Sequence, residues 1–217
     1  MIDSEKETCF NHYLCKKRGS ETDMNFVDVY KNKLAEQFER LDKQCRRKLM
    51  LMSVERQFKM YCELAEGKEW KRDNEYRDLL DKFWRITLEK EQIEESIWEW
   101  HETIRQDNVN KSRKEYTCLN FAYANIFAGN IETLIETFLE DTDHEESFLL
   151  FNIDLILSYL NEDHISQAWK YDEYESHKLI GTEMENQKND MQNVNHINNF
   201  TDAQKWHHKC KNLLAQY

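Results

Sequence analysis

The stretch FLLFNIDLILSYL, residues 148–160, decides the fold class of this chain. Only Asn152, Asp154 and Ser158 interrupt its apolar side chains, which therefore lie almost all round a helical projection. Such a segment is typical of a helix that is buried on every side. Its longest apolar runs are far shorter than the roughly 20 residues that a bilayer span requires. We therefore expect a central buried helix here, with the other helices packed around it.

The segments on either side of this stretch also show helical patterns. In the first of them Val27, Tyr30, Leu34, Phe38 and Leu41 recur every three or four residues, which predicts one apolar helix face. Gly129 and Asn130 are expected to end one helix and to cap the next. The remaining residues 1–24 are polar and are predicted to form an N-terminal extension before a single helical domain, 25–217. The predicted helices are 27–41, 43–66, 74–90, 92–105, 113–128, one from 131 onward, 148–160, 166–174, 179–191 and 201–215, the last capped by Thr201.

The composition supports the same fold class. The 217 residues include no proline and only four glycines, whereas average usage would give roughly 11 and 15. Hairpins, glycine-rich phosphate loops and polyproline linkers all need one or both of these residues. The sequence therefore predicts an all-α protein, a compact single-domain helical bundle of about eight to nine helices.

The negative charge is concentrated in one part of the chain. The formal net charge is −12, and residues 132–190 contain 16 acidic residues against three lysines and no arginine. The rest of the chain is almost neutral, with 26 acidic and 27 basic residues. An acidic face repels phosphates, which argues against nucleic-acid binding, and it attracts a cationic partner.

Within this segment, Glu132, Glu136 and Glu140 follow the i, i+4 spacing of one helix face. Like charges at this spacing repel by a few tenths of a kcal/mol per pair, and no lysine is interleaved to relieve them. A surface that only confers solubility is one interpretation, and recognition of a basic protein is the other. The predicted partner-binding residues are Glu132, Glu136, Glu140, Asp141, Asp143, Glu145 and Glu146.

Motifs for catalysis or for a cofactor are not found in the sequence. The six cysteines show no CxxC spacing, and none of the eight histidines has a glutamate three residues before it, as a di-iron bundle requires. His207, His208 and Cys210 form one tight cluster, but on a helix only positions 207 and 210 share a face. We therefore expect no enzyme activity, no cofactor and no bound metal.

Two stretches carry a resemblance to a known family. They are Val54-Glu55-Arg56-Gln57-Phe58-Lys59-Met60-Tyr61-Cys62 and Tyr76-Arg77-Asp78-Leu79-Leu80-Asp81-Lys82-Phe83-Trp84. Together with the later Glu183-Met184-Glu185-Asn186-Gln187, they make residues 26–192 similar to the YjaG-like family of uncharacterised all-helical bacterial proteins. The resemblance implies a compact helical domain and no particular reaction. Arg77 and Asp81 are expected to pair on a helix surface, with Tyr76 and Trp84 in the core.

The sequence favours a binding protein over a catalyst. We expect a bacterial immunity-type protein that neutralises a cationic toxin, above all a nuclease, through its acidic face. The alternative is a housekeeping helical adaptor or regulatory protein with no toxin partner, and a metal-dependent enzyme is a third class. The N-terminus Met-Ile-Asp-Ser-Glu-Lys-Glu lacks the pattern of a signal peptide, and no apolar run suits a membrane span, so a cytoplasmic location is expected.

Overall fold

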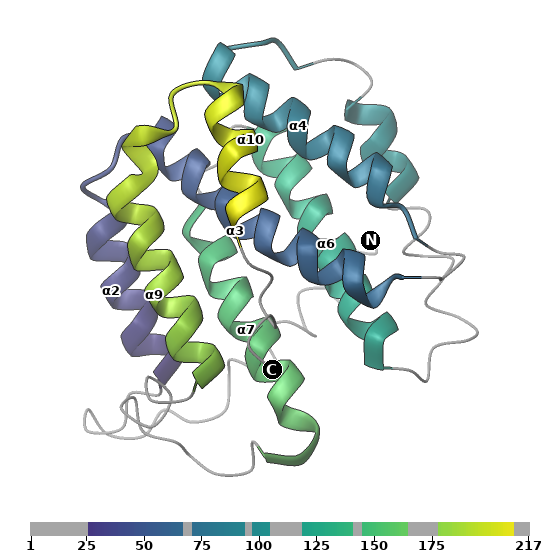
Figure 1. The fold of residues 1–217 in the computed structure, drawn as a ribbon, viewed down its shortest axis with the longest axis vertical. Coiled ribbons are helices and arrows are strands. Elements are labelled where there is room, and N and C mark those ends of the chain that lie inside the picture. Colours follow the sequence, from purple (N-terminus) through teal and green to yellow (C-terminus); the bar gives the residue numbers. More distant parts are fainter. Residues whose placement is uncertain are drawn as a thin grey trace, which may run out of the picture.

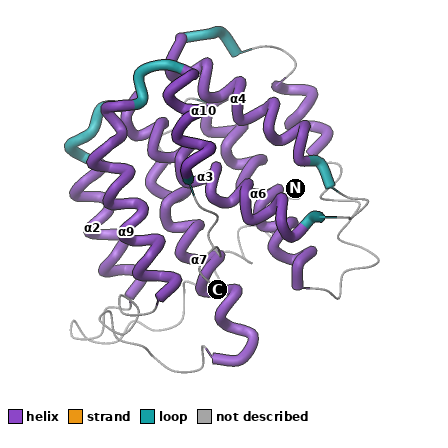
Figure 2. Tube along the Cα trace, viewed as in Figure 1, coloured by secondary structure: helices purple, strands orange, loops and turns teal. Residues whose placement is uncertain are grey.

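The computed structural model describes residues 26–66, 71–93, 97–104, 119–140, 145–164 and 178–210. These parts of the chain are helical and contain no strand, which confirms the predicted all-α fold (Figures 1 and 2). The elements are α2 (Phe26–Phe38), α3 (Lys43–Leu64), α4 (Asp73–Glu89), a helix at 97–104, α6 (Leu119–Leu139), α7 (Glu145–His164), α9 (Lys178–Asn193), the 3₁₀ turn η1 (Val194–His196) and α10 (Phe200–Lys209).

The helix α3 lies at the centre of the bundle. Its N-cap is Asp42, whose side chain accepts a hydrogen bond of 2.7 Å from the backbone N–H of Cys45. It contacts α4, α6, α7 and α9, and Figure 1 shows it crossing the middle of the molecule. Residues 48–58 are buried on all sides of this helix. The prediction that residues 148–160 form the central helix is therefore wrong, although α7 does contain them.

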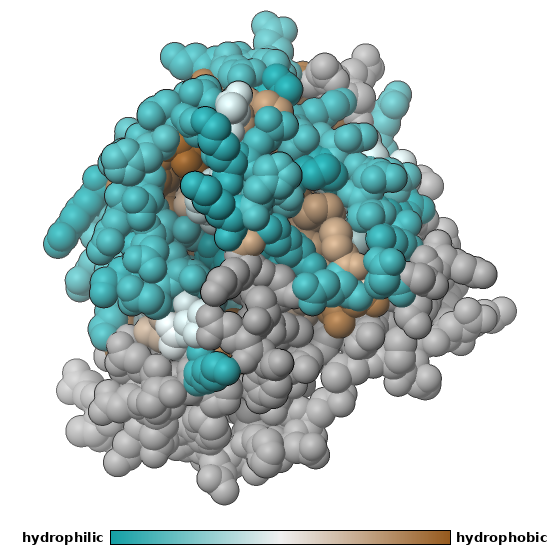
Figure 3. Space-filling view, viewed as in Figure 1, coloured by the Kyte–Doolittle hydropathy of each residue, from teal (hydrophilic) through white to brown (hydrophobic). Residues whose placement is uncertain are grey.

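Large apolar side chains fill the space between these helices. Phe83 of α4 stacks on Phe138 of α6 with ring centroids 4.3 Å apart, and Tyr61 of α3 stacks on Phe127 of α6 at 4.9 Å. The core also contains Trp84, as expected from its spacing. On the face shown in Figure 3, hydrophilic side chains cover most of the described surface, with small apolar areas between them.

The structure corrects the predicted break at residues 129 and 130. The helix α6 runs without interruption from Leu119 to Leu139, so Gly129 lies in its interior and Asn130 is not an N-cap. The reason is tertiary packing: Phe127 and Ile131 are both buried against the core, and Asn130 donates a hydrogen bond to Gln57 of α3. These contacts outweigh the roughly 1 kcal/mol that glycine costs inside a helix.

The ends of several predicted helices also differ from the structure. The last helix is capped by Asn199, whose side chain accepts from the N–H of Asp202 at 3.0 Å, and not by Thr201. Residues 92 and 93 are not helical, and that helix occupies 97–104 within the described chain. The N-terminal extension 1–24, the predicted helix 166–174 and residues 211–215 lie outside the described residues.

Candidate functional site

Three consecutive polar residues at the centre of α3 are almost completely buried. Glu55, Arg56 and Gln57 have exposed fractions of 0%, 2% and 1%. Successive residues of a helix point about 100° apart, so these three side chains reach different neighbouring helices. Burying polar groups is costly unless each one is hydrogen-bonded, and the partners described next supply those bonds.

The carboxylate of Glu55 joins α3 to α4 and α10. Arg77 of α4 donates to both of its oxygens at 2.7 Å, and the indole N–H of Trp84 donates to Oε1 at 2.9 Å. Nδ1 of His207, on α10, lies 2.7 Å from Oε2. Burial by itself would raise the pKa of Glu55, but the hydrogen bonds from His207 and Arg77 outweigh it and lower the pKa to about 2.

The guanidinium of Arg56 joins α3 to α9. It donates to Glu183 from Nη2 at 2.9 Å and forms a close ion pair with Asp190. It also lies 6.0 Å from the ring centre of Trp206 on α10. Burial raises the pKa of Asp190 to about 6, because Arg56 is shared with a second carboxylate and compensates only in part.

The amide of Gln57 joins α3 to α6 and α7. It donates to Asn152 at 2.7 Å and accepts from Asn130 at 2.8 Å. Asn152 in turn donates to Glu183 at 2.7 Å, which connects this chain of amides to the Arg56 ion pairs. Together the three residues of α3 link five helices, and their polar atoms are used for internal contacts.

This network connects the helices of the bundle, and the three α3 side chains at its centre do not face solvent. The sequence predicted one part of it, since Arg77 pairs with Asp81 at 2.6 Å, and Tyr76 and Trp84 lie in the core as expected. The second partner of Arg77, the fully buried Glu55 at 2.7 Å, was missed. The signal available was the Glu55-Arg56-Gln57 motif itself, which directly follows the mainly apolar run 49–54 and precedes Phe58.

An acidic surface lies on α6 and the helix 97–104. Glu136 and Glu140 are exposed and Glu132 is half-buried, as expected for a face of α6. The helix 97–104 adds the exposed Glu99 and Glu102, and neither helix contains a lysine or arginine. We call these five residues, Glu99, Glu102, Glu132, Glu136 and Glu140, the acidic surface.

The other predicted binding residues do not join this surface. Glu145 is buried, with 1% exposure, because it lies in the first turn of α7 against the core. Its carboxylate is therefore buried inside the protein and is not on the surface that would contact another protein. Asp141 and Asp143 lie outside the described residues, and for Glu146 the structure describes the backbone position in α7 alone.

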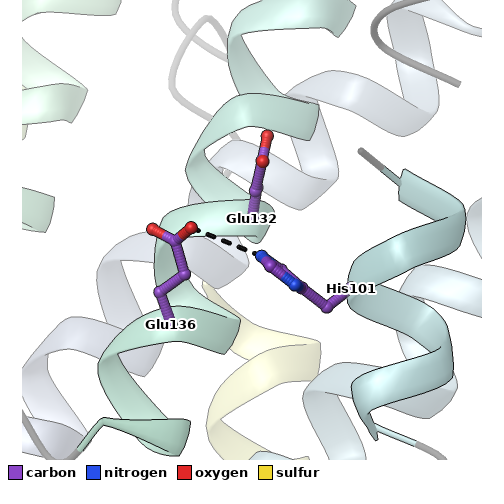
Figure 4. A group of neighbouring side chains, drawn as sticks. All are labelled: His101, Glu132 and Glu136. Carbon is purple, nitrogen blue, oxygen red and sulfur yellow. Dashed lines mark hydrogen bonds and ion pairs between the residues drawn. The ribbon is translucent and has the colours of Figure 1, made fainter. Parts of the chain in front are cut away.

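Besides its two glutamates, the helix 97–104 carries Trp98 and His101, which bear on what the acidic surface could bind. Trp98 is 53% exposed, the largest exposure among the large hydrophobic side chains that the structure describes. Its ring lies edge-on to His101, with centroids 6.5 Å apart. Nε2 of His101 lies 3.3 Å from Oε1 of Glu136, and Figure 4 shows this imidazole reaching from its helix to Glu136, with Glu132 one turn away on α6.

In the cluster of His207, His208 and Cys210 near the C-terminus, His207 and Cys210 already make contacts within the protein. His207 contacts Glu55, and Sγ of Cys210 donates to the backbone carbonyl of His207 at 3.2 Å. Among the described residues, the group with the spacing of metal ligands is instead His101, Glu132 and Glu136. Sequence reasoning missed His101 because it comes from another helix.

No protein-family model, curated protein or solved structure matches this chain. The resemblance to the YjaG-like family therefore stays a prediction from the residues quoted above. Within the described residues, no helix combines the length and the apolar character that crossing a membrane requires.

Proposed function

We propose that the protein is an immunity-type binding protein, which neutralises a cationic toxin by direct contact through the acidic surface. The observation that carries this proposal is the pairing of α6 with the helix 97–104. These two helices, which meet where His101 contacts Glu136, carry five glutamates including Glu140 just after α6, and four of the five are exposed. Within the described residues neither helix contains a lysine or arginine. A face that served solubility alone would interleave both signs of charge.

The charge of this surface suits a nuclease as the partner. A protein that cleaves RNA or DNA must be basic where it approaches phosphates. A row of carboxylates resembles that polyanion, speeds diffusional encounter and can block access to the nuclease's own site. The α6 carboxylates recur every four residues, which spaces them about 6 Å apart along the helix axis.

The exposed Trp98 supports a protein partner. Tryptophan is among the residues that contribute most to the energy of protein interfaces, particularly when it is surrounded by polar residues that exclude water. Here a half-exposed indole lies in the same helix as Glu99 and Glu102. The combination provides an apolar anchor with a charged rim, which is the common arrangement of protein interfaces.

The proposal is tested by co-expression with the product of the reading frame next to the gene for this chain. The protein should restore growth to cells in which that product is toxic, and a Trp98→Ala variant should protect them less well. The matched control is Ile93→Ala, which removes an exposed apolar side chain that is not part of the helix 97–104. If the neighbouring product is harmless, or if protection is the same without Trp98, the proposed function is wrong.

A further inference from the structure

We propose that His101, Glu132 and Glu136 form a binding site for a single divalent transition-metal ion, with zinc as the best match. The three side chains each offer one ligand atom, and these atoms all lie within 4.8 Å of one another. They come from two different helices, so the bundle itself brings them together (Figure 4). This inference concerns the same acidic surface but does not depend on the proposed partner.

The separation of two of the ligand atoms already fits a zinc ion. Zinc binds nitrogen and oxygen ligands at about 2.0–2.1 Å in tetrahedral geometry, which places two ligands roughly 3.3 Å apart. Nε2 of His101 and Oε1 of Glu136 are separated by 3.3 Å. Their separation is therefore the one that a tetrahedral ion bound to both atoms requires.

Glu132 supplies the third ligand from one turn earlier in α6. Its side chain is half-buried, and one of its carboxylate oxygens lies within 4.8 Å of the ligand atoms of His101 and Glu136. Three protein ligands leave the fourth tetrahedral position for water, as in zinc sites that remain open to solvent.

The charges around His101 favour a bound cation between these side chains over a direct His101–Glu136 contact without one. Glu132 and Glu136 repel each other at i, i+4 spacing, and neither α6 nor the helix 97–104 carries a lysine or arginine to offset this. The imidazole is largely enclosed, with 12% of its side chain exposed, so its orientation toward the carboxylates is fixed by packing. One imidazole with two carboxylates suits zinc or a similar ion better than magnesium, which prefers oxygen ligands alone.

The test is a titration of the reduced protein with Zn²⁺ in competition with a chromophoric chelator. His101→Gln removes the nitrogen ligand and keeps all five carboxylates, while Glu140→Gln removes a carboxylate of the same surface outside the site. We expect His101→Gln to lose one equivalent of Zn²⁺, or to bind it at least tenfold more weakly, and Glu140→Gln to bind as the unmodified protein does. Excess Mg²⁺ should not displace the ion.

The cysteines and the remaining histidines can also take up Zn²⁺, so the difference between variants is the measurement. If His101→Gln binds the same number of ions with the same affinity as the unmodified protein, the site does not exist. If His101→Gln fails to fold, as judged by circular dichroism, Glu136→Gln at an exposed position decides the question in the same way. Because His101→Gln retains the acidic surface, loss of Zn²⁺ binding and loss of toxin neutralisation can be told apart.

Discussion

Replacing Glu55 with glutamine should destabilise the fold by about 3 kcal/mol at pH 7. The carboxylate is fully buried and accepts hydrogen bonds from Arg77, Trp84 and His207. Its pKa of about 2, compared with the ordinary 4.5, corresponds to about 3 kcal/mol of favourable interaction with those partners. This agrees in size with the roughly 3–5 kcal/mol that breaking a buried ion pair costs.

The assay is urea unfolding followed by circular dichroism from pH 2 to pH 7. Because the folded pKa of Glu55 is depressed, its stabilisation is complete above pH 4.5 and is lost as the pH falls toward 2. The difference between the unmodified protein and Glu55→Gln should therefore shrink over that range.

The control variant is Asp81→Asn, which removes the second and partly exposed carboxylate that Arg77 contacts. We expect it to cost less than about 1 kcal/mol, as for other exposed ion pairs. If Glu55→Gln is no more destabilising than Asp81→Asn, or if its effect does not change with pH, the account of this network is wrong.

Three further predictions test other parts of the fold. Gly129→Ala should stabilise the protein by up to about 1 kcal/mol, because Gly129 lies inside α6 and an added Cβ would meet no atom within 4 Å beyond the adjoining backbone of its own helix and its two chain neighbours; thermal unfolding measures this. Asn199→Ala should lower the free energy of unfolding in urea by about 1 kcal/mol, because Asn199 is the N-cap of α10. Thr201→Ala should lower it much less. Because the pKa of Asp190 is raised to about 6, the unmodified protein should lose stability as the pH rises from 4 to 6, and Asp190→Asn should not show this loss.

Sequence reasoning identified most helices because their apolar residues recur at helical spacing. The prediction of 43–66 agrees with α3, and that of 74–90 agrees with α4, to within two residues at each end. The same reasoning failed at Gly129-Asn130, where two residues typical of a helix boundary lie within one helix. Local preference there amounts to about 1 kcal/mol, and contacts with residues far along the chain outweigh it.

The burial of charged residues could not be predicted from their type. Glu55 and Glu145 are buried and Glu136 and Glu140 are exposed, although all four are glutamates within or beside helices. What distinguishes Glu55 is that Arg77, Trp84 and His207 reach it from other helices, up to 152 residues away. The acidic stripe on α6 was predicted from its spacing, whereas the approach of His101 depends on how two helices pack.

The association rate with the product of the neighbouring reading frame tests the central claim most directly. The variant Glu99→Lys/Glu136→Lys/Glu140→Lys reverses three exposed charges of the acidic surface. The control, Glu36→Lys/Glu63→Lys/Glu185→Lys, makes the same change in net charge at exposed positions on α2, α3 and α9.

Stopped-flow measurements at low salt should show association slowed by about tenfold or more in the first variant relative to the control, because the attraction depends on where the charges lie. The difference should narrow as salt is added, since screening weakens the attraction between exposed charges. Equal association rates for the two variants at low salt would contradict the claim that the acidic surface binds the partner.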